Sequence, residues 1–192
     1  ARDPAPRDHH PLPLLAATLL CACSAGAPTS TPSGGSTTRA AASLSGRDVG
    51  LQLRPVLEVQ PANAAQCTSA SDAPPSTAPV TACASDGSLV YSLGPAVVTG
   101  TQWDTLRVDD VSVPGTTQID ALLDPSGSSA LTQATGELFS NDEPRNQLAV
   151  YAEGVVLSAP TVQQPIYGGA LVIAGGLTND EAQALLDRLT SA

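Results

Sequence analysis

The sequence predicts an α+β fold, with one small mixed or antiparallel sheet and two amphipathic helices. Three stretches indicate this class. Residues 148–157 hold two short apolar runs joined by Glu153-Gly154, a pattern typical of a β-hairpin. Residues 116–123 alternate as a half-buried strand does and lead directly into a helix. A second helix follows Thr178, where the start signal is clear.

The region that we expect to fold, residues 47–192, opens with a strand that Pro55 interrupts. Its apolar positions are Leu51, Leu53, Val56, Leu57 and Val59. Because proline cannot donate a ladder hydrogen bond, we expect either an edge strand or a bulged one. Further strands are predicted over residues 89–93, which Gly94-Pro95 ends, and within residues 103–113, where the alternation is mixed.

The first predicted helix begins after Asp124, a candidate N-cap, with Pro125 at its first position. Its expected buried stripe is Leu131, Ala134 and Leu138. Asp124, Ser126 and Ser128 also match the D-x-S-x-S metal motif of von Willebrand A domains, whose oxygens suit Mg²⁺. That fold needs a parallel sheet, whereas the preceding strand alternates as an antiparallel strand does. We therefore interpret these residues as a helix cap.

Pro160 and Pro165 bound a segment that we expect to cross the fold in an extended form. Gly168-Gly169 then lead into a strand over residues 170–174, which Gly175-Gly176 are expected to end. The second helix has Thr178 as N-cap and Glu181 three residues later, a capping box, with Asp180 favoured by the helix dipole. Its predicted buried face is Ala182, Leu185, Leu186 and Leu189.

The first 22 residues are typical of a bacterial lipoprotein signal peptide. Arg2 and Arg7 precede an apolar run, residues 12–20, that is too short to span a membrane. The following Leu-Cys-Ala-Cys predicts cleavage before a lipidated Cys23 and an extracytoplasmic, membrane-anchored protein. An ordinary secretory signal is the alternative. From Cys23, residues 23–46 are rich in Ser, Thr, Gly and Pro, and predict a flexible linker.

Composition excludes one class of partner. The chain carries a formal charge of −10, from 18 acidic and 8 basic residues. Phosphate binding needs clustered Lys and Arg, so we expect no nucleic-acid partner.

Cys67 and Cys83 lie in the predicted folded region, and in an oxidising compartment they should form a disulfide. A metal-binding or redox pair is the alternative, although no His lies near them.

Three ordered motifs resemble SecD, the accessory subunit of the Sec protein-export machinery. Residues 155–169, V-V-L-S-A-P-T-V-Q-Q-P-I-Y-G-G, resemble the head of its first large extracytoplasmic domain. Leu53-Arg54-Pro55-Val56 resembles the R-P-V strand that opens this head in actinobacterial SecD proteins. Tyr91-Ser92-Leu93-Gly94-Pro95, with Val98-Thr99-Gly100, resembles a further segment of the same head. The resemblance implies a SecD periplasmic head-like fold, with Glu153 where the family more often has Asp.

The sequence offers little for catalysis. The chain has no Lys, and both histidines, His9 and His10, fall within the predicted signal peptide. The predicted mature protein therefore lacks the partners for Ser-His, Cys-His or Schiff-base chemistry. Of the adjacent carboxylates, Asp109-Asp110 would point to opposite faces of a strand, and Asp142-Glu143 and Asp180-Glu181 are accounted for by a turn and a helix cap; a two-carboxylate hydrolase is the alternative. We expect no enzyme activity, no cofactor and no metal.

The resemblance implies a non-enzymatic accessory to protein export that binds translocating or unfolded polypeptides. Its implied partners are exported preproteins and Sec translocon components. Extended apolar ligands pair with a sheet edge or enter a shallow groove. The candidate polypeptide-binding residues are Val162, Ile166, Tyr167, Gly168 and Gly169, and the other interpretation is that Val162 and Ile166 cover the C-terminal helix. The alternative function is a ligand-binding or envelope-structural lipoprotein that reuses the fold.

Overall fold

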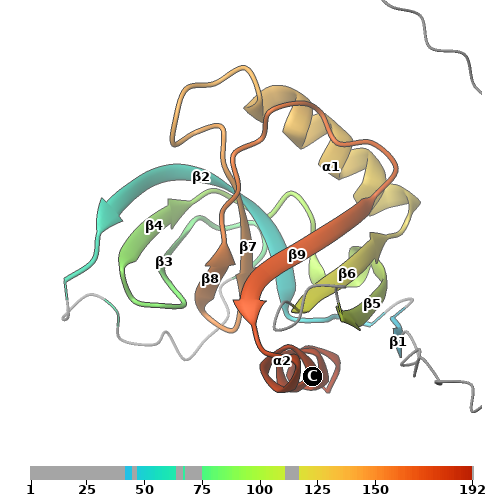
Figure 1. Ribbon diagram of the computed structural model, residues 1–192. Coiled ribbons are helices and arrows are strands. Elements are labelled where there is room, and N and C mark those ends of the chain that lie inside the picture. The colour runs from blue at the N-terminus through green and yellow to red at the C-terminus, as the bar shows by residue number, and fades with distance from the viewer. Residues whose placement is uncertain (1–41, 45–46, 64–66, 68–74, 111–116, 192) are drawn as a thin grey trace, which may run out of the picture. The chain divides into compact units, whose positions relative to one another are not determined.

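The computed structural model describes residues 42–44, 47–63, 67, 75–110 and 117–191. It confirms the α+β class: its two α-helices accompany strands that divide between an open four-stranded sheet and a closed five-stranded barrel (Figure 1). The predicted single sheet is therefore two. The alternation of a sequence locates its strands but does not say which strands pair. In this fold the pairing separates the strands into two sheets.

The open sheet has the strand order β1-β5-β6-β9 and is antiparallel throughout. It consists of β1 (Ala42–Ser43), β5 (Trp103–Asp110), β6 (Thr117–Leu123) and β9 (Ala170–Leu177). The short 3-10 helix η1 (Gly100–Gln102) leads into β5. The fold thus takes in residues 42–44, which the sequence assigned to the linker, because β1 pairs with β5 and Leu44 is buried.

The barrel has the strand order β2-β4-β3-β8-β7. Its strands are β2 (Leu51–Pro61), β3 (Val80–Ala84), β4 (Leu89–Leu93), β7 (Leu148–Ala152) and β8 (Val155–Ser158). The pairs are antiparallel except β3 with β8, which is parallel. Closure leaves β2 without a free edge, so the bulged alternative is the correct one: its register against β4 shifts between Val56 and Glu58.

The turn of the predicted hairpin is confirmed. Glu153 and Gly154 join β7 to β8, and both have positive φ, of 51° and 83°. Two positive φ values match the right-handed twist of the flanking strands. The structure also contains a strand that the sequence analysis did not predict, β3. The expected disulfide between Cys67 and Cys83 is present and links Cys67 to this strand.

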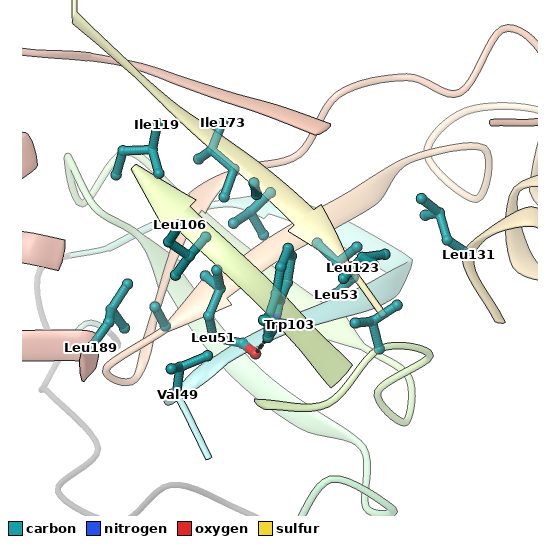
Figure 2. Close-up of a cluster of buried hydrophobic side chains, with 14 of the residues drawn as sticks. Val49, Leu51, Leu53, Trp103, Leu106, Ile119, Leu123, Leu131, Ile173 and Leu189 are labelled. Carbon is teal, nitrogen blue, oxygen red and sulfur yellow. Dashed lines mark hydrogen bonds between the residues drawn. The ribbon is translucent and has the colours of Figure 1, made fainter. Parts of the chain in front are cut away.

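The main core lies between the open sheet, both helices and one face of β2 and β7. Figure 2 shows Trp103 at its centre, among side chains from both sheets. Trp103 is fully buried, and its indole N–H donates to the carbonyl oxygen of Leu51 over 2.9 Å. This bond links the first strand of the barrel to the second strand of the open sheet. Burial of so large a side chain with its polar atom paired favours a single packing arrangement.

A second core fills the barrel, formed by Val56, Ala82, Tyr91, Leu93, Ala149, Tyr151 and Val156. Every residue of β7 is buried, because Leu148, Val150 and Ala152 face the main core while the intervening residues face the barrel. The alternation of β7 in the sequence therefore separates two interiors rather than an interior from solvent. Strand β2 is divided in the same way, with Leu51 and Leu53 on one side and Val56 on the other.

Both helices begin as the sequence predicts. The Asp124 side chain accepts from the Gly127 N–H at the start of α1 (Pro125–Leu138), and Leu131, Ala134 and Leu138 are buried. Helix α2 (Asn179–Thr190) has the capping box of Thr178 and Glu181, and buries all four predicted residues. Strand β9 continues through Gly175-Gly176 to Leu177, three residues beyond the predicted end. The register against β6 shifts there, which accommodates the two glycines as an irregularity within the strand.

Candidate functional site

The connection between β8 and β9 lies over an apolar hollow, and we call residues 158–169 the crossing segment. Helix α1 holds its centre: the Ile166 N–H donates to Thr135 Oγ1 over 2.9 Å, and Thr132 Oγ1 donates to the Ile166 carbonyl over 2.8 Å. Near its start, the Val162 N–H donates to the Asn146 carbonyl over 2.7 Å. These bonds satisfy backbone groups that a segment without strand partners would otherwise leave unpaired.

Beneath the crossing segment is an apolar cavity of about 200 Å³. One wall comes from Leu148 and Val150 of β7 with Leu53 of β2, and the other from Leu171, Val172 and Ile173 of β9. Val162 and Ile166 of the crossing segment close it on a third side, and the polar side chains that contribute to its lining are Ser158, Thr161, Gln163 and Gln164. The cavity thus lies where the barrel and the open sheet meet.

The structure brings two of the five candidate polypeptide-binding residues to this cavity. Val162 is 6% exposed and Ile166 is partly buried, and both contribute to the lining. The backbone of Ile166 is hydrogen-bonded to α1, and the core cluster that contains Val162, and against which Ile166 packs, also contains the buried residues of α2. Tyr167 is 74% exposed and does not line the cavity.

Gly168 and Gly169 turn the chain into β9, with φ values of 84° and 71°. A Cβ atom on Gly169 would lie 2.9 Å from the Cβ of Ser128, whereas one on Gly168 would meet nothing within 4 Å. The backbone therefore passes close to the first turn of α1 at Gly169. Its role in the structure is this close approach, which only glycine permits at a positive φ.

Sequence reasoning missed the wall residues of the cavity. The aliphatic residues of β7 and β9 have the periodicity of ordinary core strands, so nothing in their pattern marks them as lining an open hollow. A signal was present only in the crossing segment, where Pro160 and Pro165 exclude regular pairing and leave apolar side chains between two strands.

The outer face of the open sheet carries a second, shallower hollow, which we call the outer-face hollow. It is lined by Thr105, Arg107, Asp120, Ala121, Leu122, Ala170, Leu171 and Val172. Arg107 and Asp120 form an ion pair at 2.6 Å, and the carboxylate raises the pKa of the guanidinium. Leu122 and Val172 beside them are 38% and 58% exposed, so this face is partly apolar and open to solvent.

The described residues offer no group of three or more His, Cys, Asp or Glu side chains that could hold a metal ion. The Asp124 carboxylate accepts from the Gly127 N–H and from Ser126 Oγ, both over 2.7 Å. The hydrogen bond from the Gly127 N–H, and to a smaller extent the one from Ser126, holds the pKa of the Asp124 carboxyl below its ordinary value. The D-x-S-x-S match is therefore a helix cap, as the sequence analysis concluded.

Cys23, the predicted signal peptide and most of the predicted linker lie outside the described residues. Within the part that is described, neither α-helix has the length and apolar character that crossing a bilayer requires.

Comparisons with known proteins place most of this fold in one family. The family model described as the SecDF P1 head subdomain matches residues 80–191, from β3 to the last helix. The protein translocase subunit SecD of Streptomyces coelicolor is 33% identical over 101 residues, covering 52% of this chain and 18% of that protein. The chain thus matches less than a fifth of the length of that relative.

Two solved structures are similar at a lower level. The crystal structure of SecDF in its super-membrane-facing form gives a TM-score of 0.48 at 20% identity, covering 72% of this chain and 18% of that one. A structure of SecDF described as a membrane component that enhances protein export gives 0.47 at 20% identity, covering 75% and 64%.

Proposed function

The chain belongs to the SecDF P1 head subdomain family, and we propose that it binds extended, apolar polypeptide segments as a non-enzymatic accessory to protein export. The observation that carries the proposal is the apolar cavity of about 200 Å³ beneath the crossing segment. A cavity of about 150 Å³ is enough to hold benzene. There is thus room for a large apolar side chain of a bound polypeptide.

The lining supports a ligand that varies in sequence. Its aliphatic side chains attract apolar groups without directional demands, so they discriminate weakly among Val, Leu, Ile and Phe. The serine, threonine and glutamine side chains of the lining offer hydrogen bonds that a passing backbone can accept or donate. Of the adjacent carboxylate pairs in the described region, Asp180-Glu181 belongs to a helix cap and Glu143 of Asp142-Glu143 accepts a hydrogen bond from Thr161. Asp109-Asp110 ends strand β5, and a strand directs successive side chains to opposite faces, which supports binding rather than catalysis.

We propose further that a lipid on Cys23 anchors the domain at the extracytoplasmic face of the cell membrane, and that exported preproteins and Sec translocon components are its partners. The support is the Leu-Cys-Ala-Cys sequence and the kinship with a protein translocase subunit. Detergent partitioning of the wild-type and Cys23→Ser proteins tests the anchor. A Cys23→Ser protein that stays in the detergent phase contradicts it.

The binding proposal is tested by filling the cavity. Ser158, at the end of β8, lines the cavity and is partly buried. We expect Ser158→Phe to place an aromatic ring in the hollow and to weaken binding of a fluorescently labelled, permanently unfolded protein about tenfold or more, the equivalent of losing one buried apolar anchor. The measurement is fluorescence anisotropy, with the melting temperature recorded for each variant.

Ser140→Phe is the matched control, because Ser140 is exposed after α1 and does not line the cavity. Equal affinity of the wild type and Ser158→Phe would remove the cavity from the site. If the wild type binds no unfolded polypeptide but does bind a small apolar molecule that Ser158→Phe excludes, the alternative of a ligand-binding lipoprotein replaces the proposal.

A further inference from the structure

Strand β9 is an edge strand, and its first four residues carry none of the sequence features that usually protect an edge. It hydrogen-bonds to β6 and, among the residues that the structure describes, to no strand on its other side. Residues 170–173 read Ala-Leu-Val-Ile, without a proline, a charge or a register shift. Natural sheets protect their edges with prolines, charged side chains and bulges, or by keeping the edge strand very short. The opposite edge of this sheet is protected in the last way, because β1 has only two residues.

The register shows which backbone groups of β9 are available. The Leu123 N–H donates to the Gly169 carbonyl, which identifies this pair as hydrogen-bonded across β6 and β9. In an antiparallel ladder the bonded pairs alternate, so Leu171 and Ile173 also face β6. The N–H and C=O groups of Ala170 and Val172 consequently point away from β6, toward the free edge.

The apolar cavity and the outer-face hollow lie on opposite faces of this edge. They share Leu171 and Val172 as lining residues. A strand added beside β9 would direct successive side chains to opposite faces of the sheet. One set would enter the apolar cavity, and the alternate set would lie on the outer face beside the exposed Val172.

The net charge of the chain restricts which polypeptides can bind at this edge. The chain has a formal charge of −10, and the Arg107 of the outer-face hollow is already paired with Asp120. An acidic segment would meet net repulsion and a cationic one would be attracted over long range, whereas a neutral segment would meet neither effect.

From these observations we infer that the free edge of β9 docks an extended, neutral or cationic polypeptide with apolar residues at alternate positions, which adds to the open sheet as a fifth strand. The inference rests on the proposed function and specifies how the client is held. Main-chain hydrogen bonds to Ala170 and Val172 give binding without sequence selectivity. The two hollows select for apolar side chains on alternate residues.

Val172→Pro tests the inference because its effect on the fold and its effect on the edge are separable. The N–H of Val172 faces away from β6, so proline removes an outward donor and obstructs pairing at the edge without removing a bond of the β6–β9 ladder. Val172→Thr, which keeps the N–H and the shape of the side chain, is the matched control. The probe is a labelled decapeptide of alternating valine and serine flanked by lysines.

We expect Val172→Pro to weaken binding of this peptide about tenfold or more, while Val172→Thr changes it less than about threefold. A glutamate-flanked version of the peptide should bind more weakly than the lysine-flanked one at low salt. Unfolding by heat verifies that both variants are folded.

If Val172→Pro binds the peptide like the wild type while Ser158→Phe does not, the edge inference is overturned and the proposed function stands. If neither the peptide nor unfolded protein binds the wild type, the proposed function itself fails. If the wild type is a dimer that Val172→Pro dissociates and the peptide does not compete, the edge serves a second copy of this chain, and the inference is also overturned.

Discussion

Arg54 shows how one residue can organise the interior of a small barrel. Its side chain is fully buried, and burial lowers the pKa of the guanidinium. The fork donates to the carbonyls of Ala78 and Gly94 over 2.7 and 2.9 Å, and to the Gln52 side chain over 2.8 Å. The cation also lies 5.4 Å from the centre of the Tyr151 ring. Carbonyl dipoles and an aromatic face thus replace the water that a buried charge loses.

Arg54→Lys should therefore lower the free energy of unfolding by about 2–4 kcal/mol, because an ammonium cannot span the carbonyls that the planar fork reaches. Urea denaturation followed by Trp103 fluorescence measures the change. Arg145→Lys, at an exposed position, is the control and should change stability by less than about 0.5 kcal/mol. Equal effects of the two substitutions would show that the buried hydrogen bonds do not stabilise the fold.

The helices depend on their first turns, and both first turns depend on a carboxylate. Glu181 accepts from the N–H and the hydroxyl of Thr178 over 2.8 Å, and these bonds lower its pKa. The pKa of Asp124 is lowered in a similar way, by the hydrogen bonds that its carboxylate accepts from the Gly127 N–H and from Ser126. A carboxylate with a depressed pKa in the folded state stabilises the protein above its ordinary pKa of about 4, and this contribution is lost as pH falls through the lowered value.

A variant carrying both Asp124→Asn and Glu181→Gln should lose stability less steeply than the wild type as pH falls below about 4. Asn and Gln still accept the capping hydrogen bonds but do not titrate in this range. Melting temperatures between neutral and acidic pH measure the slope. A double variant that is as acid-sensitive as the wild type would contradict a role of these caps.

At this scale the sequence predicted most of the elements. Both helices, the β7–β8 hairpin and the strands β4 and β6 follow from local signals such as caps, turns and alternation. Strand β3 did not, because its five residues, Val-Thr-Ala-Cys-Ala, carry few large apolar side chains to mark the hairpin that it forms with β4, and its other partner, β8, lies more than 70 residues away. Of the residues that line the cavity, the sequence indicated only those of the crossing segment. The walls from β2, β7 and β9 come together only when the barrel and the open sheet pack against each other.

On the scale of the molecule, the disulfide and the barrel interior are connected. Cys67 and Cys83 enclose the stretch that contains Pro75 and Ala78, whose carbonyls accept from Arg54. The covalent link therefore holds the acceptors of a buried cation in place, in addition to restricting the unfolded chain.

Replacing Cys67 and Cys83 by alanine should lower the free energy of unfolding by about 3 kcal/mol, the entropy of closing a loop with a sequence separation of 16. Chemical denaturation with and without a reducing agent measures it, and the reducing agent should not affect the double variant. Combined with Arg54→Lys, the loss should be smaller than the sum of the separate losses, because both changes release the same loop. Strict additivity would contradict the connection.

Strands β2 and β7 each belong to two interiors, and this determines how the domain comes apart. If the barrel alone lost its structure, both strands would expose the faces that cover Trp103 and its neighbours, and the main core would lose a wall. Loss of the open sheet would expose the opposite faces in the same way. Neither partly unfolded form keeps a closed interior, so we expect the domain to unfold cooperatively, without a populated intermediate. A pulling force applied to β9 would thus be resisted by the stability of the whole domain rather than by that of one sheet.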